Sequence, residues 1–250
     1  MPDAGDARPL VLITGAAGTI GSQLVPRLGG RWRLLATDLR PRARAQIEAL
    51  DVTDSVGCRA MFAGADAVVH LAADPDPQAD WNRLRGPNIE GAYVVAAAAR
   101  DCGVRRLVLA SSLQAVSAYP DQRQRRAGDP PLPANLYGAS KAWAEALGAW
   151  VGASSPTSVV ALRIGYFAQR APCGEEATSR DRSAWLSPDD CARLVQAAVE
   201  SDVTGLVVVN GISANRYRLA ELGDAEARIG YRPADDAWAL TEESRSDHND

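Results

Sequence analysis

Short apolar runs alternate with longer amphipathic segments along most of the chain. The apolar runs, which predict buried strands, lie at 9–15, 31–38, 64–73, 105–112, 158–165 and 205–211, and a further short strand falls within 45–53. Segments with helical periodicity, several of them rich in alanine, lie at 21–30, 88–104, 137–154 and 187–201. Strands that alternate with helices predict an α/β fold with a doubly wound parallel sheet.

Two residues stand out within the predicted helices. Ser187 precedes a helical segment with carboxylates in its first turn, which is typical of a helix N-terminus. Pro26 lies inside the segment 21–30, where a proline removes a backbone donor, and the pattern offers no reason for it.

The chain shows no internal repeat and no linker rich in glycine and serine, so we expect a single domain over 9–240. The ends, 1–8 and 241–250, are polar and are expected to be disordered. The segment 166–184 has no clear periodicity, and a loop of this length in a compact domain is often a lid or a binding loop. We expect it to form part of a small C-terminal region that binds substrate.

Composition narrows the function classes. The 27 basic and 31 acidic residues give a formal net charge of −4, which provides no bulk attraction to nucleic acid. No apolar run approaches the roughly 20 residues of a membrane span, and the polar N-terminus lacks the order of a signal peptide, so a cytoplasmic protein is expected. The four cysteines form no CxxC pair and there are two histidines, so neither a disulfide framework nor a metal site is expected.

The first predicted strand ends in the sequence TGAAGTIG, which contains Gly15, Gly18 and Gly21. Glycines between a strand and a helix allow a ligand to approach the main chain closely, and the positive end of the helix dipole favours an anion there. The context therefore predicts a turn that binds the pyrophosphate of a dinucleotide, with a purely structural turn as the alternative.

Asp38 ends the second predicted strand, roughly 20 residues beyond the glycines, where a dinucleotide site uses a carboxylate to accept hydrogen bonds from the adenosine ribose. A carboxylate there repels the extra phosphate of NADP, although Arg40 could soften this preference, so we expect NAD. Asp51 follows the third strand and is either a contact on the adenine side or an ordinary turn residue.

Tyr137 and Lys141 stand four residues apart at the start of a predicted helix and therefore project from one face. A nearby ammonium stabilises a phenolate and lowers the pKa of tyrosine from its reference value of about 10, so the pair predicts a group that transfers protons. The alternative is a surface lysine beside a half-buried tyrosine.

The motifs that carry a family resemblance occur in order along most of the chain. They are TGAAGTIG at 14–21, Asp38, DVTD from Asp51, HLAA from His70, Asn88 in PNIEG, ASS from Ala110 and YGASK from Tyr137. This set resembles the extended short-chain dehydrogenase/reductases of the NAD-dependent epimerase/dehydratase family. The resemblance implies a Rossmann-type sheet, NAD as the cofactor and a sugar or sugar acid as the small-molecule substrate.

The resemblance also implies roles for single residues. Ser112 would bind the reacting oxygen, Tyr137 would transfer the proton, and Lys141 would bind the cofactor ribose and lower the pKa of Tyr137. Asn88 would be a structural or relay residue at the cofactor site. The residues expected to contact NAD are Gly15, Ala17, Gly18, Thr19, Ile20, Asp38, Leu39, Asp51, Val52, Leu71, Ala72, Ala73, Asn88, Tyr137, Lys141 and Ile164.

Within the family, RIG from Arg163 and WLSPDDCARLV from Trp185 resemble uronate dehydrogenases, which oxidise the anomeric hydroxyl of a sugar acid. The residues expected to bind substrate are Ser112, Gln114, Arg170, Arg180 and Arg182, with an arginine gripping a carboxylate. Alternatively, the three arginines are solvated and balanced by Glu175, Glu176 and Asp181.

Leu113 and Gln114 cannot supply the additional acid and base of a sugar dehydratase. A sugar epimerase and, less favoured, a non-catalytic dinucleotide-binding protein remain alternatives. The segment AWAEALGAW from Ala142 has small and aromatic residues, and the resemblance implies a homodimer that pairs through this helix.

Overall fold

The computed structural model describes residues 7–40, 46–173 and 177–240. Its main sheet has seven strands in the order β3-β2-β1-β4-β5-β6-β9, and every neighbouring pair is parallel. The strands are β1 Leu10–Thr14, β2 Arg33–Asp38, β3 Ile47–Ala49, β4 Ala67–His70, β5 Arg106–Ser112, β6 Ser158–Ile164 and β9 Leu206–Gly211. The predicted doubly wound parallel sheet is confirmed, and its strand order reverses beside β1, where such sheets open a ligand crevice.

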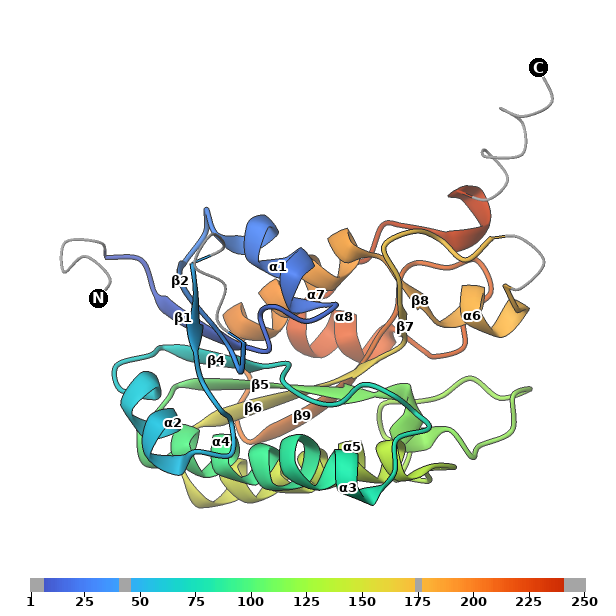
Figure 1. Ribbon diagram of the computed structural model, residues 1–250. Coiled ribbons are helices and arrows are strands. Elements are labelled where there is room, and N and C mark those ends of the chain that lie inside the picture. The colour runs from blue at the N-terminus through green and yellow to red at the C-terminus, as the bar shows by residue number, and fades with distance from the viewer. Residues whose placement is uncertain (1–6, 41–45, 174–176, 241–250) are drawn as a thin grey trace.

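Helices cover both faces of this sheet (Figure 1). One face carries α1 Gly21–Leu28, α7 Pro188–Glu200 and α8 Gly223–Ile229, and the other carries α2 Ser55–Phe62, α4 Gly91–Asp101 and α5 Leu136–Ser154. Alternate residues of β1 enter two separate cores: Val11 and Ile13 pack with the first group of helices, and Leu10 and Leu12 with the second. Burial of both faces explains why the strands read as continuous apolar runs.

Several short elements were not predicted from the sequence. They are α2, α3 Trp81–Leu84, the π-helical turn η2 Arg85–Glu90, the 3₁₀ turn η3 Leu113–Val116, α6 Ser179–Ala184, α8 and the paired strands β7 Tyr166–Phe167 and β8 Trp185–Leu186. Asp54 caps α2 by accepting a hydrogen bond of 3.0 Å from the amide of Val56. Thr178 and Asp181 form a reciprocal capping box at α6. Both caps are visible in the sequence as polar residues ahead of short helical segments.

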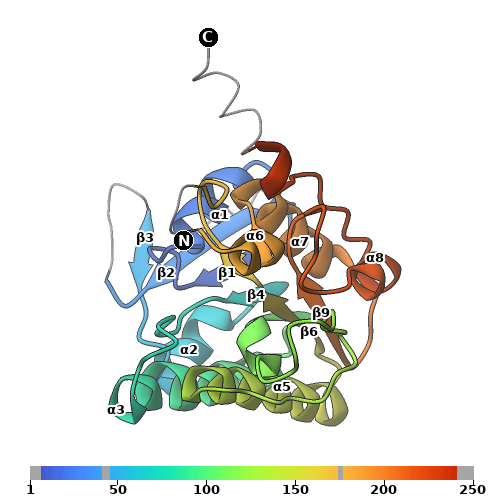
Figure 2. The same ribbon diagram turned by 90° about the vertical axis from the view of Figure 1, so that its right-hand side faces the viewer.

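The segment 166–184 is more regular than expected. Strand β7 at its start pairs with β8, which follows directly after the segment, and α6 lies between them at the end of the molecule where the carboxyl ends of the main strands meet (Figures 1 and 2). Residues 174–176 of this segment, and the predicted tails except Ala7 and Arg8, fall outside the described residues. Pro26 lies exposed within α1, and nothing in the structure explains it. Among the described helices, none combines the length and apolar character that a membrane span requires.

Candidate active site

The glycine-rich turn connects β1 to α1 at the reversal of strand order. Gly15 has a φ of +72°, and a Cβ atom built there would lie 2.6 Å from the amide nitrogen of Ala72. A Cβ atom at Gly21 would lie 2.4 Å from the carbonyl oxygen of Gly15. Neither position has room for a side chain, so these glycines let the turn, the end of β4 and the start of α1 pack closely.

The turn leaves main-chain donors available. Among the described residues, no hydrogen bond uses the amide N–H of Thr19 or Ile20, and both residues line the main cavity. These amides stand at the start of α1, where the helix dipole attracts negative charge. The arrangement fits the pyrophosphate of a dinucleotide.

Asp38 ends β2 beside this turn. Its Oδ2 atom accepts a hydrogen bond of 3.0 Å from the amide of Ala17, and its Oδ1 atom accepts one of 3.1 Å from the amide of Arg40. Leu39, which lies between Asp38 and Arg40 in the sequence, is 65% exposed. Two main-chain amides therefore hold the carboxylate at the end of β2, beside the glycine-rich turn.

Asp51 has a local role in the structure. Its Oδ1 atom accepts hydrogen bonds from the amide of Thr53 at 2.9 Å and from the hydroxyl of Thr53 at 2.7 Å. Val52 is buried, and its Cγ2 atom would lie 2.7 Å from a Cβ atom at Gly91. These contacts support the turn alternative for Asp51, whose side chain is exposed beyond the main cavity.

The HLAA motif forms the end of β4 and the floor of the site. His70 is buried, and its Nδ1 atom lies 2.8 Å from the Oγ1 atom of Thr14. Burial, with the nearby charge of Lys141, lowers the pKa of His70 to about 3, so the imidazole is neutral. Leu71 and Ala73 line the cavity, and the amide of Ala72 approaches Gly15.

Asn88 lies in the π-helical turn η2, a geometry that often occurs at functional sites. Its Nδ2 atom donates to the carbonyl of Asp74 and to the Oγ atom of Ser140, both at 3.1 Å, and its Oδ1 atom accepts from the amide of Asp74 at 2.8 Å. The side chain is buried and does not line the cavity. Because its polar atoms are taken by protein groups, Asn88 joins the loop after β4 to α5, and its structural role is favoured over direct cofactor contact.

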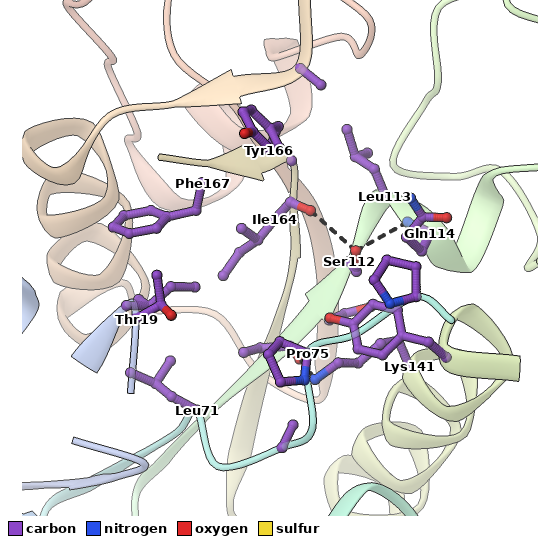
Figure 3. Close-up of a pocket in the computed structure, with 18 of the residues that line it drawn as sticks. Thr19, Leu71, Pro75, Ser112, Leu113, Gln114, Lys141, Ile164, Tyr166 and Phe167 are labelled. Carbon is purple, nitrogen blue, oxygen red and sulfur yellow. Dashed lines mark hydrogen bonds between the residues drawn. The ribbon is translucent and has the colours of Figure 1, made fainter. Parts of the chain in front are cut away.

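The main cavity has a volume of about 370 Å³ and lies at the carboxyl ends of the strands (Figure 3). Ten of the residues predicted for the site line it: Thr19, Ile20, Leu71, Ala73, Ser112, Gln114, Tyr137, Lys141, Ile164 and Arg180. The others lie outside its lining: Gly15, Ala17, Gly18, Asp38, Leu39, Asp51, Val52, Ala72, Asn88, Arg170 and Arg182. The cavity thus joins one end of the turn to the serine, tyrosine and lysine.

Ser112 ends β5 and caps η3. Its Oγ atom accepts a hydrogen bond of 3.1 Å from the amide of Gln114 and donates one of 3.4 Å to the carbonyl of Ile164 (Figure 3). Ser112 and Tyr137 both line the cavity, and the Ser112 hydroxyl acts to lower the pKa of the Tyr137 phenol. The hydroxyl pair is therefore assembled at the cavity wall.

Tyr137 and Lys141 come from the first turns of α5, which Asn135 caps through a bond of 2.7 Å from the amide of Gly138. The Nζ atom of Lys141 donates a hydrogen bond of 2.8 Å to the carbonyl of Ala110 and lies 5.5 Å from the centre of the Tyr137 ring. The two side chains share one helix face, as their spacing predicts.

The pKa of Tyr137 differs from the expectation. Burial raises it to about 12 and the charge of Asp74 adds to the increase, whereas the neighbouring hydroxyl of Ser112 acts in the opposite direction. Burial also lowers the pKa of Lys141 to about 8. Burial and Asp74, rather than Lys141, dominate the pKa of Tyr137 here, and the predicted effect of Lys141 on that pKa stays a prediction.

The three candidate arginines occupy different surroundings. Arg180, at the start of α6, lines the cavity and forms an ion pair with Asp121. The Nε atom of Arg182 donates to the carbonyl of Pro172 at 3.1 Å, and Arg170 is exposed. Only Arg180 of the three is placed to meet a ligand in the cavity. Glu175 and Glu176, expected to balance them, lie outside the described residues.

Other lining residues had not been predicted for the site. Pro75 and Pro77 come from the loop after β4, Tyr166 and Phe167 from β7, and Leu219 from the segment after β9. The position of Tyr166 and Phe167 directly after the RIG motif could have indicated them. No local signal identifies Leu219, which reaches the cavity through a long-range pairing of 125 with 220.

A buried ion pair supports the same strands. Arg163 donates from Nε and from a terminal nitrogen to the two carboxylate oxygens of Glu145, both at 2.8 Å. Ser111 donates a hydrogen bond of 2.6 Å to the same carboxylate. The network ties β5, β6 and α5 together at Ser111, the residue before Ser112. Within the described part of the chain, no group of three or more His, Cys, Asp or Glu residues could hold a metal ion.

Comparison with known proteins agrees with this geometry. Residues 11–168 match the model of the NAD dependent epimerase/dehydratase family. The chain is 36% identical to an NAD-dependent glucose-6-phosphate dehydrogenase of Haloferax volcanii, over 92% of this chain and 95% of the relative. It is 34% identical to an L-arabinose 1-dehydrogenase (NAD(P)(+)) of the same organism, over 93% of this chain and 99% of the relative.

A solved structure is also similar. A mutant of uronate dehydrogenase from Agrobacterium tumefaciens, complexed with NAD, superposes with a TM-score of 0.85 at 30% identity, and the match covers 95% of this chain and 89% of that one. Family, fold and cofactor therefore agree with what the motifs predict. The chain belongs to the NAD-dependent epimerase/dehydratase family, and within it is an NAD-dependent dehydrogenase on a Rossmann-type sheet.

Proposed function

We propose that the protein oxidises the anomeric hydroxyl of a monosaccharide or sugar acid to a lactone. The observation that carries the proposal is the placement of Ser112, Tyr137 and Lys141 around one cavity that extends to the glycine-rich turn. Support also comes from the relatives, whose names assign them to glucose 6-phosphate, to carbon 1 of L-arabinose and to uronates.

The residues that would hold NAD come from the ends of β1 and β2 and from helix α5. The amides of Thr19 and Ile20 would bind the pyrophosphate, and Asp38 would accept hydrogen bonds from the adenosine ribose. Lys141 would bind the second ribose with its ammonium group. When bound, the nicotinamide supplies a hydride acceptor.

The chain's own residues would manage the proton and the oxygen. Loss of hydride from the alcohol carbon requires the hydroxyl proton to leave, and Tyr137 would take it while Ser112 holds the oxygen in place. Since the phenol of Tyr137 has a raised pKa, the neighbouring hydroxyl of Ser112, which acts to lower that pKa, is part of the proposal.

The substrate side would be defined by Gln114 and Arg180. The Oε1 atom of Gln114 accepts a hydrogen bond of 3.0 Å from Asn135, which fixes the amide near the serine. Arg180 is suited to a carboxylate or a phosphate because its planar group can form two parallel hydrogen bonds. An anionic sugar is therefore the favoured substrate class.

We further propose a cytoplasmic homodimer that pairs through α4 and α5. Tyr93 on α4 and Trp143 on α5 are 51% and 40% exposed, and the rings of Tyr93 and Trp150 stack with centroids 6.2 Å apart. Exposed aromatic residues on neighbouring helices favour a protein contact. Sedimentation at micromolar concentration tests this, and a species of only 26.5 kDa would count against it.

The function is tested by incubating the purified enzyme with NAD and D-glucuronate, glucose 6-phosphate or L-arabinose. We expect NADH to form with at least one of these sugars and a lactone to accumulate. Formation of an epimer of the sugar without net NADH would instead support an epimerase.

A further inference from the structure

We propose that Asp121 is a specificity-determining residue that weakens the binding of anionic substrates by competing for Arg180. This inference deepens the proposed function and rests on it. It would make the enzyme's preference between charged and neutral sugars depend on a residue outside the cavity lining.

The first observation is how little of Arg180 is occupied. Among the described residues, its guanidinium makes one hydrogen bond, from a terminal nitrogen to the Oδ1 atom of Asp121. Arg180 is 42% exposed and Asp121 is 62% exposed, and ion pairs with this exposure are weak. The remaining N–H groups stay available to a second anion, or an anion can displace the pair.

The second observation is that Asp121 cannot move away easily. Its Oδ1 atom also accepts a hydrogen bond of 2.9 Å from Arg125, which is 1% exposed. The guanidinium of Arg125 further donates to the carbonyls of Tyr119 at 2.7 Å, Arg123 at 2.8 Å and Pro120 at 3.1 Å. The buried guanidinium of Arg125 thus fixes both the loop 119–125 and the carboxylate of Asp121 within that loop.

The loop is also attached to the cavity wall. The amide of Arg125 donates to the carbonyl of Leu219 at 2.9 Å, and Leu219 lines the cavity. Arg180 reaches the same cavity from α6, so the Asp121–Arg180 pair joins two segments that are far apart in sequence. Figures 1 and 2 show both segments at the end of the molecule where the sheet opens.

The charges around the cavity make the sign of the effect clear. Lys141 and Arg180 are the cations of its described lining, and Asp181 is the anion. The Oδ2 atom of Asp181 accepts hydrogen bonds from the amide and hydroxyl of Thr178, at 3.1 and 2.7 Å, within the cap of α6. Asp121 is therefore the carboxylate bound to Arg180, and its charge opposes an anionic group there and leaves a neutral sugar almost unaffected.

The experiment measures dissociation constants by calorimetry for D-glucuronate, glucose 6-phosphate and neutral D-glucose. Asp121→Asn removes the charge and keeps an oxygen acceptor, and it should tighten binding of the two anions roughly two- to five-fold with D-glucose unchanged. The gain should shrink in high salt and should disappear when Arg180→Gln is present as well.

Glu221→Gln is the matched control. Glu221 is also an exposed carboxylate paired with an arginine, Arg126, at 2.9 Å, and its side chain does not line the cavity. This variant should leave all three dissociation constants unchanged. An equal gain with Glu221→Gln, an equal gain for D-glucose, or no tighter anion binding by Asp121→Asn would overturn the inference. Failure of the proposed function would appear separately, as an absence of NADH formation while the difference in binding persists.

Discussion

The carboxylate of Asp38 accepts a 3.0 Å hydrogen bond from the amide of Ala17, which ties the end of β2 to the glycine-rich turn. Because the carboxylate is fixed there, the enzyme should bind NADH more tightly than NADPH, whose extra phosphate would meet a negative charge. Asp38→Asn should narrow that difference by improving the binding of NADPH. Titrations that follow nicotinamide fluorescence measure the dissociation constants of NADH and NADPH. Equal or tighter NADPH binding by the native enzyme would contradict the prediction.

Tyr137→Phe tests proton transfer. The change removes the phenol hydroxyl and keeps the ring, so turnover should fall by about 100-fold or more, the usual scale for a positioned acid–base group. The dissociation constant of NADH should change little because the phenol is not expected to anchor the cofactor. If turnover stays near the native value, Tyr137 does not have the proposed role.

Gly15→Ala tests the packing of the turn. A methyl group there meets the backbone of Ala72 at 2.6 Å in addition to the strain of a φ of +72°. Gly64 has a φ of +78° and no atom within 4 Å of a built Cβ, so Gly64→Ala isolates the conformational strain.

We expect Gly64→Ala to lower the free energy of unfolding by about 1 kcal/mol and to leave NADH binding intact. Gly15→Ala should be clearly more destabilising and should weaken NADH binding. Denaturant unfolding and NADH titration of the two variants provide the comparison. If Gly15→Ala and Gly64→Ala changed the free energy of unfolding equally and changed NADH binding equally, the contact with Ala72 would be unimportant.

His70 should make the protein sensitive to acid. Its pKa is lowered to about 3 in the folded state, below the ordinary histidine value of 6.5, so the unfolded chain binds more protons between these values. The contribution of the neutral His70 to the free energy of unfolding is fully present above about pH 7. It is lost progressively as the pH falls from 6.5 toward 3. At pH 4.5 the loss from this residue is on the order of 3 kcal/mol.

His70→Gln removes this titration. The difference in unfolding free energy between native and variant proteins should therefore be constant above pH 7 and should shift in favour of the variant on acidification. Denaturant unfolding at several pH values measures it. A difference that stays flat down to pH 4.5 would show that the imidazole is not held neutral by the fold.

The sequence predicts those features that local patterns determine. Because both faces of the sheet are buried, β1, β4, β5, β6 and β9 occur in the sequence as apolar runs that identify them as strands. The turn from Gly15 to Gly21 can be identified from its glycines, which are needed because the packing leaves no room for side chains. The short helices α3 and α6, with four and six residues, are too short for periodicity to identify them.

Features that depend on distant segments were not predictable in the same way. The pKa of Tyr137 follows from burial and from Asp74, and the lining by Leu219 follows from a contact with 125, so neither appears in a local pattern. The same holds for Arg180, which the sequence could not distinguish from Arg170 and Arg182. Only the fold shows that Arg180 lines the cavity and pairs with Asp121.

The most direct test of the account is net NADH formation from a panel of uronic acids, free aldoses, sugar phosphates and nucleotide sugars, with the products resolved by stereochemistry. We expect NADH and a lactone in equal amounts from at least one free or phosphorylated monosaccharide or uronic acid. Turnover confined to nucleotide-linked sugars, or an epimer formed without net NADH, would contradict the proposed sugar dehydrogenase.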